Sequence, residues 1–421
     1  MRRNIKDSEI EWIGCIPENW KLTKNKYVMH KEKVICEKYS GEDVLSLSVN
    51  GVIKRNLDAG GKMPTSFDGY QYTVPGDLLL CLFDIDVTPR CVGLIKNEGV
   101  TSPAYSRYKV HEGCDASYYD FLLRSIDDKK VFVHLSKNLR NSLNETDFGV
   151  LPTIEPPYEE QVAIAEFLQK QCENIDLILE KTIMSIDEYK KLKETVISRA
   201  VTRGIRTDRK FLKSGIKWVQ ELPEGWKEIN PKALFIQRKD KAFEGERQLT
   251  ASQQYGVIFQ EDYMEITGSK IVTVEKDFSI LKHVEEGDFV ISMRSFQGGL
   301  EYSENTGSIS SAYVMLIPNL EKVYPKFYRW LFKSSVYINA LQSTSNLVRD
   351  GQAMRYSNFA QVRLYDIPIE EQKEIADYLE EKCKAIDVLI EKKEKFVNEL
   401  KQYKESIIYE YVTGKKEVPE S

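Results

Sequence analysis

The sequence predicts an α+β fold: two β-rich domains joined by two long helices that pack antiparallel as a coiled coil, with pseudo-two-fold symmetry. Three observations lead to this prediction. The landmarks of the chain occur twice, about 210 residues apart, which indicates a repeated domain. Each copy places short strand-like segments before one long helical segment. Both helical segments carry apolar residues at heptad spacing, the pattern of helices that pack against each other.

The repeat keeps its order along nearly the whole chain. The segment "EEQVAIAEFLQKQCENIDLILEK" at 159–181 recurs as "EEQKEIADYLEEKCKAIDVLIEK" at 370–392, a shift of 211 residues without a gap. The segment "IEWIGCIPENW" at 10–20 recurs as "IKWVQELPEGW" at 216–226, a shift of 206 residues. Between them, "LSVNGVI" corresponds to "SQQYGVI" and "PGDLLLCL" corresponds to "EGDFVISM". We interpret this as a tandem duplication, because the period is too long for a solenoid repeat.

Each copy begins with strand-like runs separated by turn residues. "DVLSLSVNGVIKRN" alternates apolar and polar residues around a glycine turn, and "YTVPGDLLLCLFDID" is an apolar run opened by Pro-Gly-Asp. The second copy matches with "GDFVISMRSFQGG" and "SSAYVMLIP". A short helix is predicted at "DASYYDFLLRSI" and at "YPKFYRWLFKSSVYINAL". Each copy therefore reads as a β-rich domain that ends in a long helix.

The long helical segments share an apolar seam with heptad spacing. Steps of four and three residues connect positions that are apolar except at two equivalent places, where Thr182 matches Lys393 and Lys193 matches Lys404. Such a stripe buries itself against another helix, and the duplication supplies the partner. We predict that the two helices pack along this seam, which contains Leu168, Cys172, Ile175, Leu179, Ile186, Leu379, Cys383, Ile386, Ile390, Val397 and Leu400.

Residues at the helix ends support these limits. Pro157 and the pair Glu159 and Glu160 suit a helix N-terminus, because proline is tolerated in the first turn and carboxylates favour the positive end of the dipole. Gly204 and Gly414 suit the C-terminal ends. A pseudo-two-fold axis would then place one domain at each end of an antiparallel pair. The alternative is an ordinary helical hairpin within one core.

Composition bounds the class of protein. The 421 residues favour two or three domains, and 42% hydrophobic with 30% charged residues describe a globular chain. No apolar run approaches the ~20 residues of a bilayer span, and the N-terminus lacks the apolar core of a signal peptide. Seven cysteines without a C-x-x-C motif favour reduced thiols and a cytoplasmic location. A net charge of -5 disfavours a uniformly basic surface that coats nucleic acid.

Motifs that carry catalysis are not found in the sequence. The four histidines form neither H-E-x-x-H nor a close pair with cysteine, and neither a P-loop nor a Rossmann glycine motif is present. "EPPYEE" contains Pro-Pro-Tyr but lacks the preceding asparagine of the N-P-P-Y motif in amino-methyltransferases. We therefore predict that the isolated chain has no catalytic residues and binds neither a metal nor a cofactor.

Loops of both copies are rich in side chains that can pair with base edges. Arg, Asn and Gln can form bidentate hydrogen bonds with guanine and adenine. The alternative is that these polar loop residues are only solvated and have no binding role. The loops differ between the copies while their flanks agree, as expected if each copy reads a different sequence. The predicted DNA-binding residues are Asn50, Lys54, Arg55, Arg90, Lys137, Arg140, Asn141, Gln253, Gln254, Arg294, Gln297, Arg349, Gln352 and Arg355.

With these features in view, the chain resembles the DNA-specificity subunit of a type I restriction–modification system. "SEIEWIGCIPENW", "SGIKWVQELPEGW" and the twin "EEQ…IA…L…C…ID…EK" helices carry the resemblance, which spans nearly the whole chain. The family often has a longer proline run before the helix than the "DIPIEEQ" found here, which does not affect the helix prediction.

The resemblance implies a non-catalytic subunit that reads a bipartite DNA target. Its expected partners are double-stranded DNA, two modification (methyltransferase) subunits that bind S-adenosylmethionine, and an optional restriction subunit. The alternative is a coiled-coil scaffold that binds only proteins. The implied domains are a first target recognition domain at 1–155, a spacer helix at 156–204, a linker with a second target recognition domain at 205–368, a second spacer helix at 369–414 and a tail at 415–421.

Overall fold

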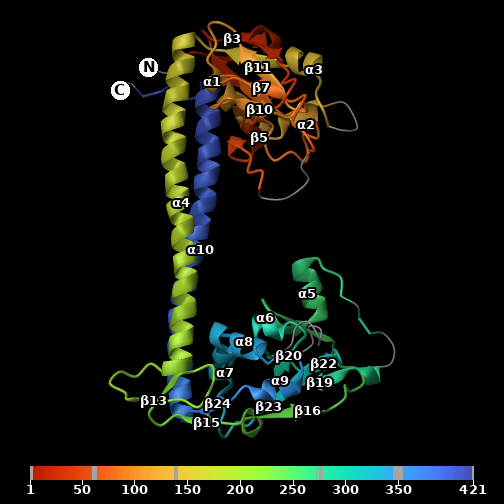
Figure 1. Cartoon of the computed structure of the whole chain (residues 1–421), viewed down its shortest axis with the longest axis vertical. Coiled ribbons are helices and arrows are strands. Elements are labelled where there is room, and N and C mark those ends of the chain that lie inside the picture. The colour runs from red at the N-terminus through yellow and green to blue at the C-terminus, as the bar shows by residue number, and fades with distance from the viewer. Residues whose placement is uncertain are drawn as a thin grey trace. The chain divides into compact units, whose positions relative to one another are not determined.

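A computed structural model describes residues 3–58, 64–136, 141–271, 273–274, 278–344 and 354–419. Contacts within the chain group it into two compact units. Unit 1 consists of residues 1–183 and 395–421, and unit 2 consists of residues 184–394. The fold is mixed α+β, with β-rich regions and two long helices, as predicted (Figure 1).

Unit 1 contains two four-stranded sheets and two smaller strand pairs. The larger sheets have the strand orders β6-β5-β10-β7 and β4-β11-β8-β9, and the pairs are β1-β2 and β12-β3. All pairings in unit 1 are antiparallel except that of β10 with β5. The strands are β1 (Ile5–Asp7), β2 (Cys15–Pro17), β3 (Lys21–Lys24), β4 (Met29–Glu32), β5 (Val44–Ser48), β6 (Gly51–Lys54), β7 (Gln71–Thr73), β8 (Leu78–Leu80), β9 (Val92–Leu94), β10 (Gly99–Thr101), β11 (Ser106–Val110) and β12 (Pro152–Glu155).

Unit 2 repeats one four-stranded sheet of this arrangement, and its other described strands form the pairs β13-β14, β15-β24, β17-β18 and β19-β22. Its four-stranded sheet has the order β16-β23-β20-β21, which matches β4-β11-β8-β9 strand for strand, and β17-β18 matches the β5-β6 hairpin. The strands are β13 (Phe211–Lys213), β14 (Glu221–Pro223), β15 (Lys227–Ile229), β16 (Phe235–Arg238), β17 (Leu249–Ser252), β18 (Gly256–Phe259), β19 (Lys282–Val284), β20 (Phe289–Ile291), β21 (Glu301–Tyr302), β22 (Gly307–Ile309), β23 (Val314–Pro318) and β24 (Leu364–Asp366).

Short helices lie between and after the strands in both units. In unit 1 they are α1 (Ala116–Asp128), α2 (Val131–Leu135) and α3 (Glu145–Val150), and in unit 2 they are α5 (Gln260–Thr267), α6 (Ser295–Gly298), α7 (Pro325–Lys333), α8 (Ser335–Gln342) and α9 (Tyr356–Gln361). The single helix predicted over the segment of α7 and α8 is interrupted at Ser334, whose side chain accepts a hydrogen bond from the Tyr337 amide and caps α8.

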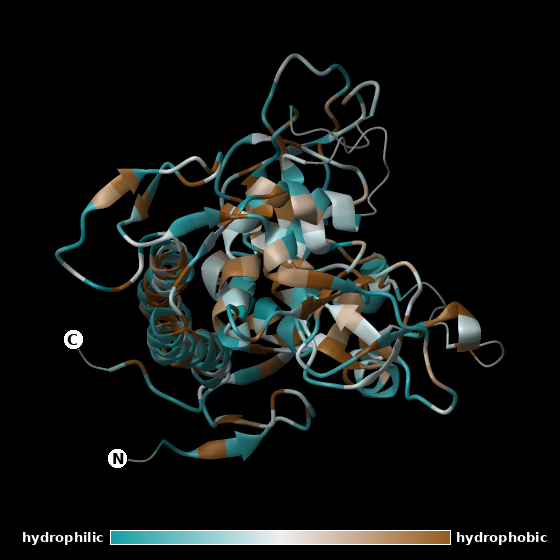
Figure 2. Ribbon diagram, turned by 90° about the horizontal axis from the view of Figure 1, so that it is seen from below, coloured by the Kyte–Doolittle hydropathy of each residue, from teal (hydrophilic) through white to brown (hydrophobic). Residues whose placement is uncertain are grey.

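The long helices are α4 (Tyr158–Arg203) and α10 (Ile369–Val412), and each contributes residues to both units. In unit 1 the start of α4 meets the end of α10, where the rings of Phe167 and Tyr411 lie 4.6 Å apart. In unit 2 the end of α4 meets the start of α10, where Lys193 contacts Asp387. Within each unit the helices therefore run antiparallel (Figure 1), and both carry hydrophobic as well as hydrophilic residues (Figure 2).

The predicted seam lies largely in the apolar interior of the two units. Leu179 and Leu400 are partly buried, and the other predicted seam residues are buried. Some seam residues also belong to the main hydrophobic cores: Leu168 is part of the core of unit 1, and Leu379 is part of the core of unit 2.

The two lysines that interrupt the seam are paired with aspartates of the opposite helix. Lys404 Nζ lies 2.6 Å from Asp176 Oδ1 in unit 1, and Lys193 Nζ lies 2.6 Å from Asp387 Oδ2 in unit 2. The lysines are 211 residues apart, and so are the aspartates, so the two ion pairs are equivalent under the repeat. Each lysine keeps its aliphatic stem in the seam while its ammonium reaches the rim.

The repeated tryptophan and glutamate signatures meet in unit 1. Trp20 of "PENW" donates its indole N–H to Glu160 of "EEQ" over 2.9 Å, and Arg3 binds the same carboxylate. Burial opposes ionisation of Glu160, but hydrogen bonds from Arg3, Trp20 and Asn19 outweigh it and lower the pKa of this carboxyl. The first signature thus anchors the start of the long helix.

Unit 2 builds the same anchor with altered contacts. Arg209 forms a bidentate ion pair with Glu371, the equivalent of Glu160. The indole of Trp226 stacks on Tyr365 at 5.1 Å instead of donating to that carboxylate. The Tyr365 hydroxyl in turn donates to the carbonyl of Val201 in the last turn of α4.

Glycines end both long helices, as predicted. Gly204 has φ = 71° and Gly414 has φ = 69°, the left-handed conformation of a C-terminal glycine cap. Gly414 also packs closely, because a β-carbon there would lie 2.5 Å from Cδ of Pro17 and 2.9 Å from the ring of Trp20.

We expect Gly414→Ala to lower the free energy of unfolding by about 2–4 kcal/mol, the combined cost of a left-handed alanine and of overpacking. Gly113→Ala is the matched control, because Gly113 has φ = 83° but a β-carbon added there would have no neighbouring atom within 4 Å. The control should lose only about 1–2 kcal/mol. Urea unfolding of both variants measures the difference, and equal losses would contradict the packing argument.

Candidate nucleic-acid interface

The two equivalent hairpins carry predicted DNA-binding residues at their tips. In β5-β6, Ser48 pairs with Gly51 across a two-residue turn, and the Ser48 hydroxyl accepts a hydrogen bond from the Asn50 amide. In β17-β18, Ser252 pairs with Gly256 across a three-residue turn, and the Ser252 hydroxyl accepts one from the Gln254 amide. The frame is the same, but the tips differ in length and sequence.

The tip in unit 1 presents Asn50 to solvent, and two cations lie at the end of the following strand and just after it. Lys54 is exposed and pairs with Asp43 at 2.5 Å, whereas Arg55 is half-buried. A hollow of about 530 Å³ beside this strand is lined in part by Tyr39, Lys54 and Arg55. Three predicted DNA-binding residues therefore lie close together on one hairpin.

Arg90 lies beside the same tip, at the end of the loop that connects β8 to β9. Its guanidinium donates to the carbonyl of Val49 over 2.8 Å and to the carbonyl of Val92 over 3.0 Å. Burial and the neighbouring Arg124 lower the pKa of Arg90, although the group remains charged at neutral pH. Arg90 is therefore committed to backbone contacts in the structure.

The tip in unit 2 brings two further predicted loops together. Gln253 and Gln254 are exposed in the turn, and Arg294 and Gln297 are exposed at α6, in the loop after β20. The Gln253 side-chain amide donates to the carbonyl of Arg294 over 3.4 Å. It also lies over Gly298, where an added β-carbon would approach it to 2.6 Å.

The remaining predicted residues are more scattered. Asn141 is half-buried with φ = 44°, and its side chain accepts a hydrogen bond from Ser136. Arg355 is exposed at the start of α9. Four predicted residues fall outside the described part of the chain: Lys137, Arg140, Arg349 and Gln352.

A buried arginine lies on the sheet β4-β11-β8-β9 of unit 1. Arg107 on β11 is 1% exposed and binds Glu32 on β4 over 2.9 Å, while its Nε lies 3.4 Å from the buried carboxylate of Asp77. Burial raises the pKa of Asp77, and the nearby Arg107 partly offsets that rise. Asp77 belongs to the repeated "PGD" turn that precedes β8.

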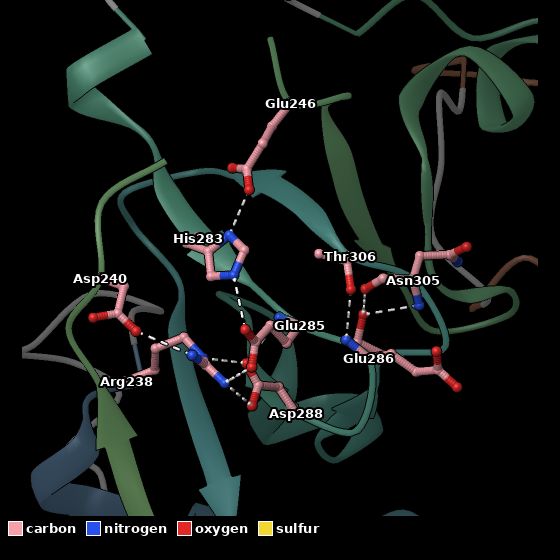
Figure 3. A network of polar contacts seen from close by, with 10 residues as sticks. Arg238, Asp240, Glu246, His283, Glu285, Glu286, Asp288, Asn305 and Thr306 are labelled. Carbon is pink, nitrogen blue, oxygen red and sulfur yellow. Dashed lines mark hydrogen bonds and ion pairs between the residues drawn. The ribbon is translucent and has the colours of Figure 1, made fainter. Parts of the chain in front are cut away.

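Unit 2 has the equivalent aspartate but takes its arginine from another strand. Asp288, in the "EGD" turn before β20, binds Arg238 on β16 over 2.6 Å. Arg238 also contacts Glu285 and Asp240 (Figure 3). Burial opposes the charge of Arg238, but the three carboxylates outweigh it and raise the pKa of this guanidinium. The cross-strand neighbour of Arg238 is Met315.

The strand pairs β4-β11 and β16-β23 are equivalent, but the buried arginine lies on the second strand of the pair in unit 1 and on the first strand in unit 2. In β4-β11 the pair is Glu32 with Arg107, and in β16-β23 it is Arg238 with Met315. The repeat maps Glu32 to Arg238 by the shift of 206 residues seen at the start of each copy. Both units thus neutralise one buried aspartate with one buried arginine. This exchange was not predicted from the sequence.

His283 extends the network of unit 2. The buried imidazole lies 2.6 Å from Glu246 through Nδ1 and 3.5 Å from Glu285 through Nε2 (Figure 3). Among the described residues, no group of three or more His, Cys, Asp or Glu side chains is arranged to hold a metal ion. A bilayer span would require a longer apolar stretch than any helix in the described part of the chain provides.

Comparisons with known proteins place this fold. No family model matches the chain. The putative type I restriction enzyme MjaX specificity subunit of Methanocaldococcus jannaschii is 26% identical over 312 residues, which cover 72% of this chain and 68% of the relative. The HsdS subunit from Thermoanaerobacter tengcongensis has a TM-score of 0.56 at 14% identity, with 97% of this chain and 100% of that chain covered. Over most of its length the chain is therefore similar to type I restriction specificity subunits.

A second solved structure, from work on complex assembly and conformational transition of the type I R-M system, agrees with this specificity-subunit fold. It has a TM-score of 0.68 at 13% identity and covers 95% of this chain and 99% of that chain. The resemblance predicted from the twin signatures is thus confirmed by the curated relative, and these structures agree in fold. A specificity subunit is a non-catalytic component, and S-adenosylmethionine is bound by the methyltransferase subunit of such a system.

Proposed function

We propose that this specificity subunit reads a bipartite DNA target, one short word with each unit, and carries the methyltransferase subunits that modify it. The observation that carries this proposal is the pair of equivalent hairpins with unlike tips. Both tips lie on the same Ser–Gly frame, yet one presents Val-Asn and the other Gln-Gln-Tyr. A shared frame with divergent polar tips is what two readers of different words require.

The charge of the chain agrees with readout by limited surfaces. The net charge of -5 does not favour broad phosphate coating, whereas exposed Asn50, Gln254, Arg294 and Gln297 offer base-pairing groups at defined places. We assign base contacts first to these four residues. Lys54, at the end of β6, and Arg55, which follows it, suit phosphate contacts, which fix register and orientation.

We further propose that the outer faces of α4 and α10 bind the two modification subunits. Several large apolar residues are exposed there in pairs that the 211-residue repeat relates: Leu177 with Val388, Ile178 with Leu389, and Leu192 with Tyr403. Exposed apolar residues in repeated positions suit two copies of one partner. A restriction subunit is a further, optional partner of the complex.

The test is selection of bound sequences from random duplex DNA by the chain together with its methyltransferase. We expect enrichment of two short words at one fixed separation. One continuous word, or no enriched word, would refute the proposal. A scaffold that binds only proteins would give no enrichment.

Salt dependence provides an independent control for that selection. If phosphate contacts contribute, log affinity for the selected DNA falls linearly with log salt concentration. Lys54→Met should reduce this slope by about one and weaken all sequences alike, as a lost phosphate contact does. Asn50→Ala should instead relax one base position of one word.

A further inference from the structure

The tip of each equivalent hairpin is tied to the loop that follows the equivalent sheet strand. In unit 1 this loop connects β8 to β9, and in unit 2 it connects β20 to β21. The tie in unit 1 runs from Arg90 in the loop to the carbonyl of Val49 in the tip. The tie in unit 2 runs the other way, from Gln253 in the tip to the carbonyl of Arg294 in the loop.

Arg90 holds its position through two backbone carbonyls on different segments. The acceptors are Val49 in the hairpin turn and Val92 on β9, at 2.8 Å and 3.0 Å. Hydrogen bonds from a charged donor are roughly twice as strong as neutral ones. The guanidinium also lies against Gly51, where a β-carbon would be in van der Waals contact at 3.7 Å. Arg90 therefore fixes a turn whose side chains, Val49 and Asn50, are exposed.

A two-residue turn can recognise DNA more specifically when hydrogen bonds fix its backbone conformation. Base readout depends on side chains placed within a fraction of an ångström, and immobilising a free turn on binding would cost conformational entropy. A tie made before DNA arrives removes that cost. Among the described residues, the other side-chain hydrogen bonds at this tip are those of the Ser48 hydroxyl, which accepts from the Asn50 amide and donates to the Gly51 carbonyl.

Unit 2 uses a neutral and longer tie in the same place. The Gln253 amide spans 3.4 Å to the carbonyl of Arg294 and covers Gly298 of α6. Arg294 and Gln297 keep their side chains exposed. The tie thus joins the tip that carries Gln254 to the loop that carries Arg294 and Gln297.

We propose that Arg90 and Gln253 are positioning residues of the two reading surfaces, each locking a hairpin tip to its neighbouring loop, and that base contacts fall to the exposed residues beside them. This assignment rests on the proposed function of DNA reading. It changes the role of two residues that the sequence marked as DNA-binding. A positioning residue acts on several base contacts at once, whereas a base-contacting residue acts on one.

The first experiment measures the tie in the full chain without DNA. Hydrogen exchange of the peptide covering residues 46–54 should become about tenfold faster in Arg90→Met, since a hydrogen bond to a charged group is lost. Arg90→Lys keeps one donor and should restore part of the protection. Arg55→Met is the matched control, because the described contact of Arg55 with β5 is made by its backbone amide, and exchange should stay unchanged.

The same variants then enter the DNA selection with the methyltransferase. Arg90→Met should lower discrimination about tenfold, spread over several positions of one word, and leave the other word and the spacing intact. Uniform weakening at every position of both words, or relaxation at a single position, would overturn the assignment. Unchanged hydrogen exchange in Arg90→Met would also overturn it.

Unit 2 allows a test that leaves Gln253 in the chain. Gly298→Ala places a methyl group where the Gln253 side chain lies, and that flexible side chain can move aside at little cost to the fold. Gly298→Ala and Gln253→Ala should broaden the same word, and the double variant should add nothing further. Additive effects would contradict a shared tie.

The two hypotheses fail separately. If the wild-type chain selects no words, the proposed function fails, while the exchange data still decide whether the tie exists. If wild type selects two words but Arg90→Met selects them unchanged, the positioning role fails and the proposed function stands.

Discussion

Arg107→Met is expected to lower the free energy of unfolding by about 3–5 kcal/mol, because it leaves the buried carboxylate of Asp77 without its cation. Arg107 is 1% exposed and Asp77 is 5% exposed, so water cannot replace the lost partner. Methionine retains the volume of the stem, which separates the loss of charge from a loss of packing. Glu32→Gln is the control, since this partly exposed carboxylate should contribute no more than about 1 kcal/mol.

The pH dependence of this variant provides a second signature. Burial already raises the pKa of Asp77, and removal of Arg107 removes an opposing contribution, so the pKa rises further. When the pKa of a carboxyl is higher in the folded than in the unfolded state, the folded protein loses stability as the pH rises through the folded-state pKa. The destabilisation of Arg107→Met should therefore be largest at neutral pH and smaller at acidic pH. Urea unfolding at several pH values measures this difference.

Because the buried arginine lies on opposite strands in the two units, a second substitution should restore the stability that Arg107→Met loses. Arg107→Met with Glu32→Arg copies the pair Arg238 and Met315 of unit 2 into the equivalent strands of unit 1. An arginine at position 32 should reach Asp77 as Arg238 reaches Asp288, and should restore at least half of the lost stability. A double variant no more stable than Arg107→Met would show that the two strand pairs are not interchangeable.

The long helices could be predicted from the sequence because their signal is local and repeated. The heptad steps from Leu168 and from Leu379 continue over six turns or more, and glycine marks both ends. The duplication strengthened the prediction, since each helix supplied the partner of the other. The paired Lys193 and Lys404 were visible only as interruptions, because their aspartates lie on the opposite helix.

The candidate site was less predictable because its contacts join residues far apart in the sequence. The loop residue Arg90 was marked for its side chain, but its contact with Val49 depends on how the β5-β6 hairpin packs beside β9. The arginine exchange requires the register of β4 with β11 and of β16 with β23. The short α6 was missed, since "SMRSFQGG" shows neither helical spacing nor a cap.

Deletion of one heptad from both long helices is expected to shorten the preferred spacer between the two words by about 3 base pairs. Seven helical residues span about 10 Å, and each base pair of B-DNA rises by about 3.4 Å. Residues 181–187 and 392–398 are the segments to remove, because they are equivalent under the repeat and lie between the two Lys–Asp pairs on both helices. Both ion pairs and the seam register are then retained.

The identity of both words should survive this deletion, since the hairpins and their loops are unchanged. Affinity should fall as well, because 3 base pairs rotate one half-site by about 100° around a duplex of roughly 10.5 base pairs per turn. Selection from random DNA reports the words and the spacer in one measurement. A deletion of residues 181–187 alone is the control, because it misaligns one ion pair and should destabilise the helix pair. Altered words with an unaltered spacer would show that the helices do not set the spacing, and that the units locate their half-sites by another part of the complex.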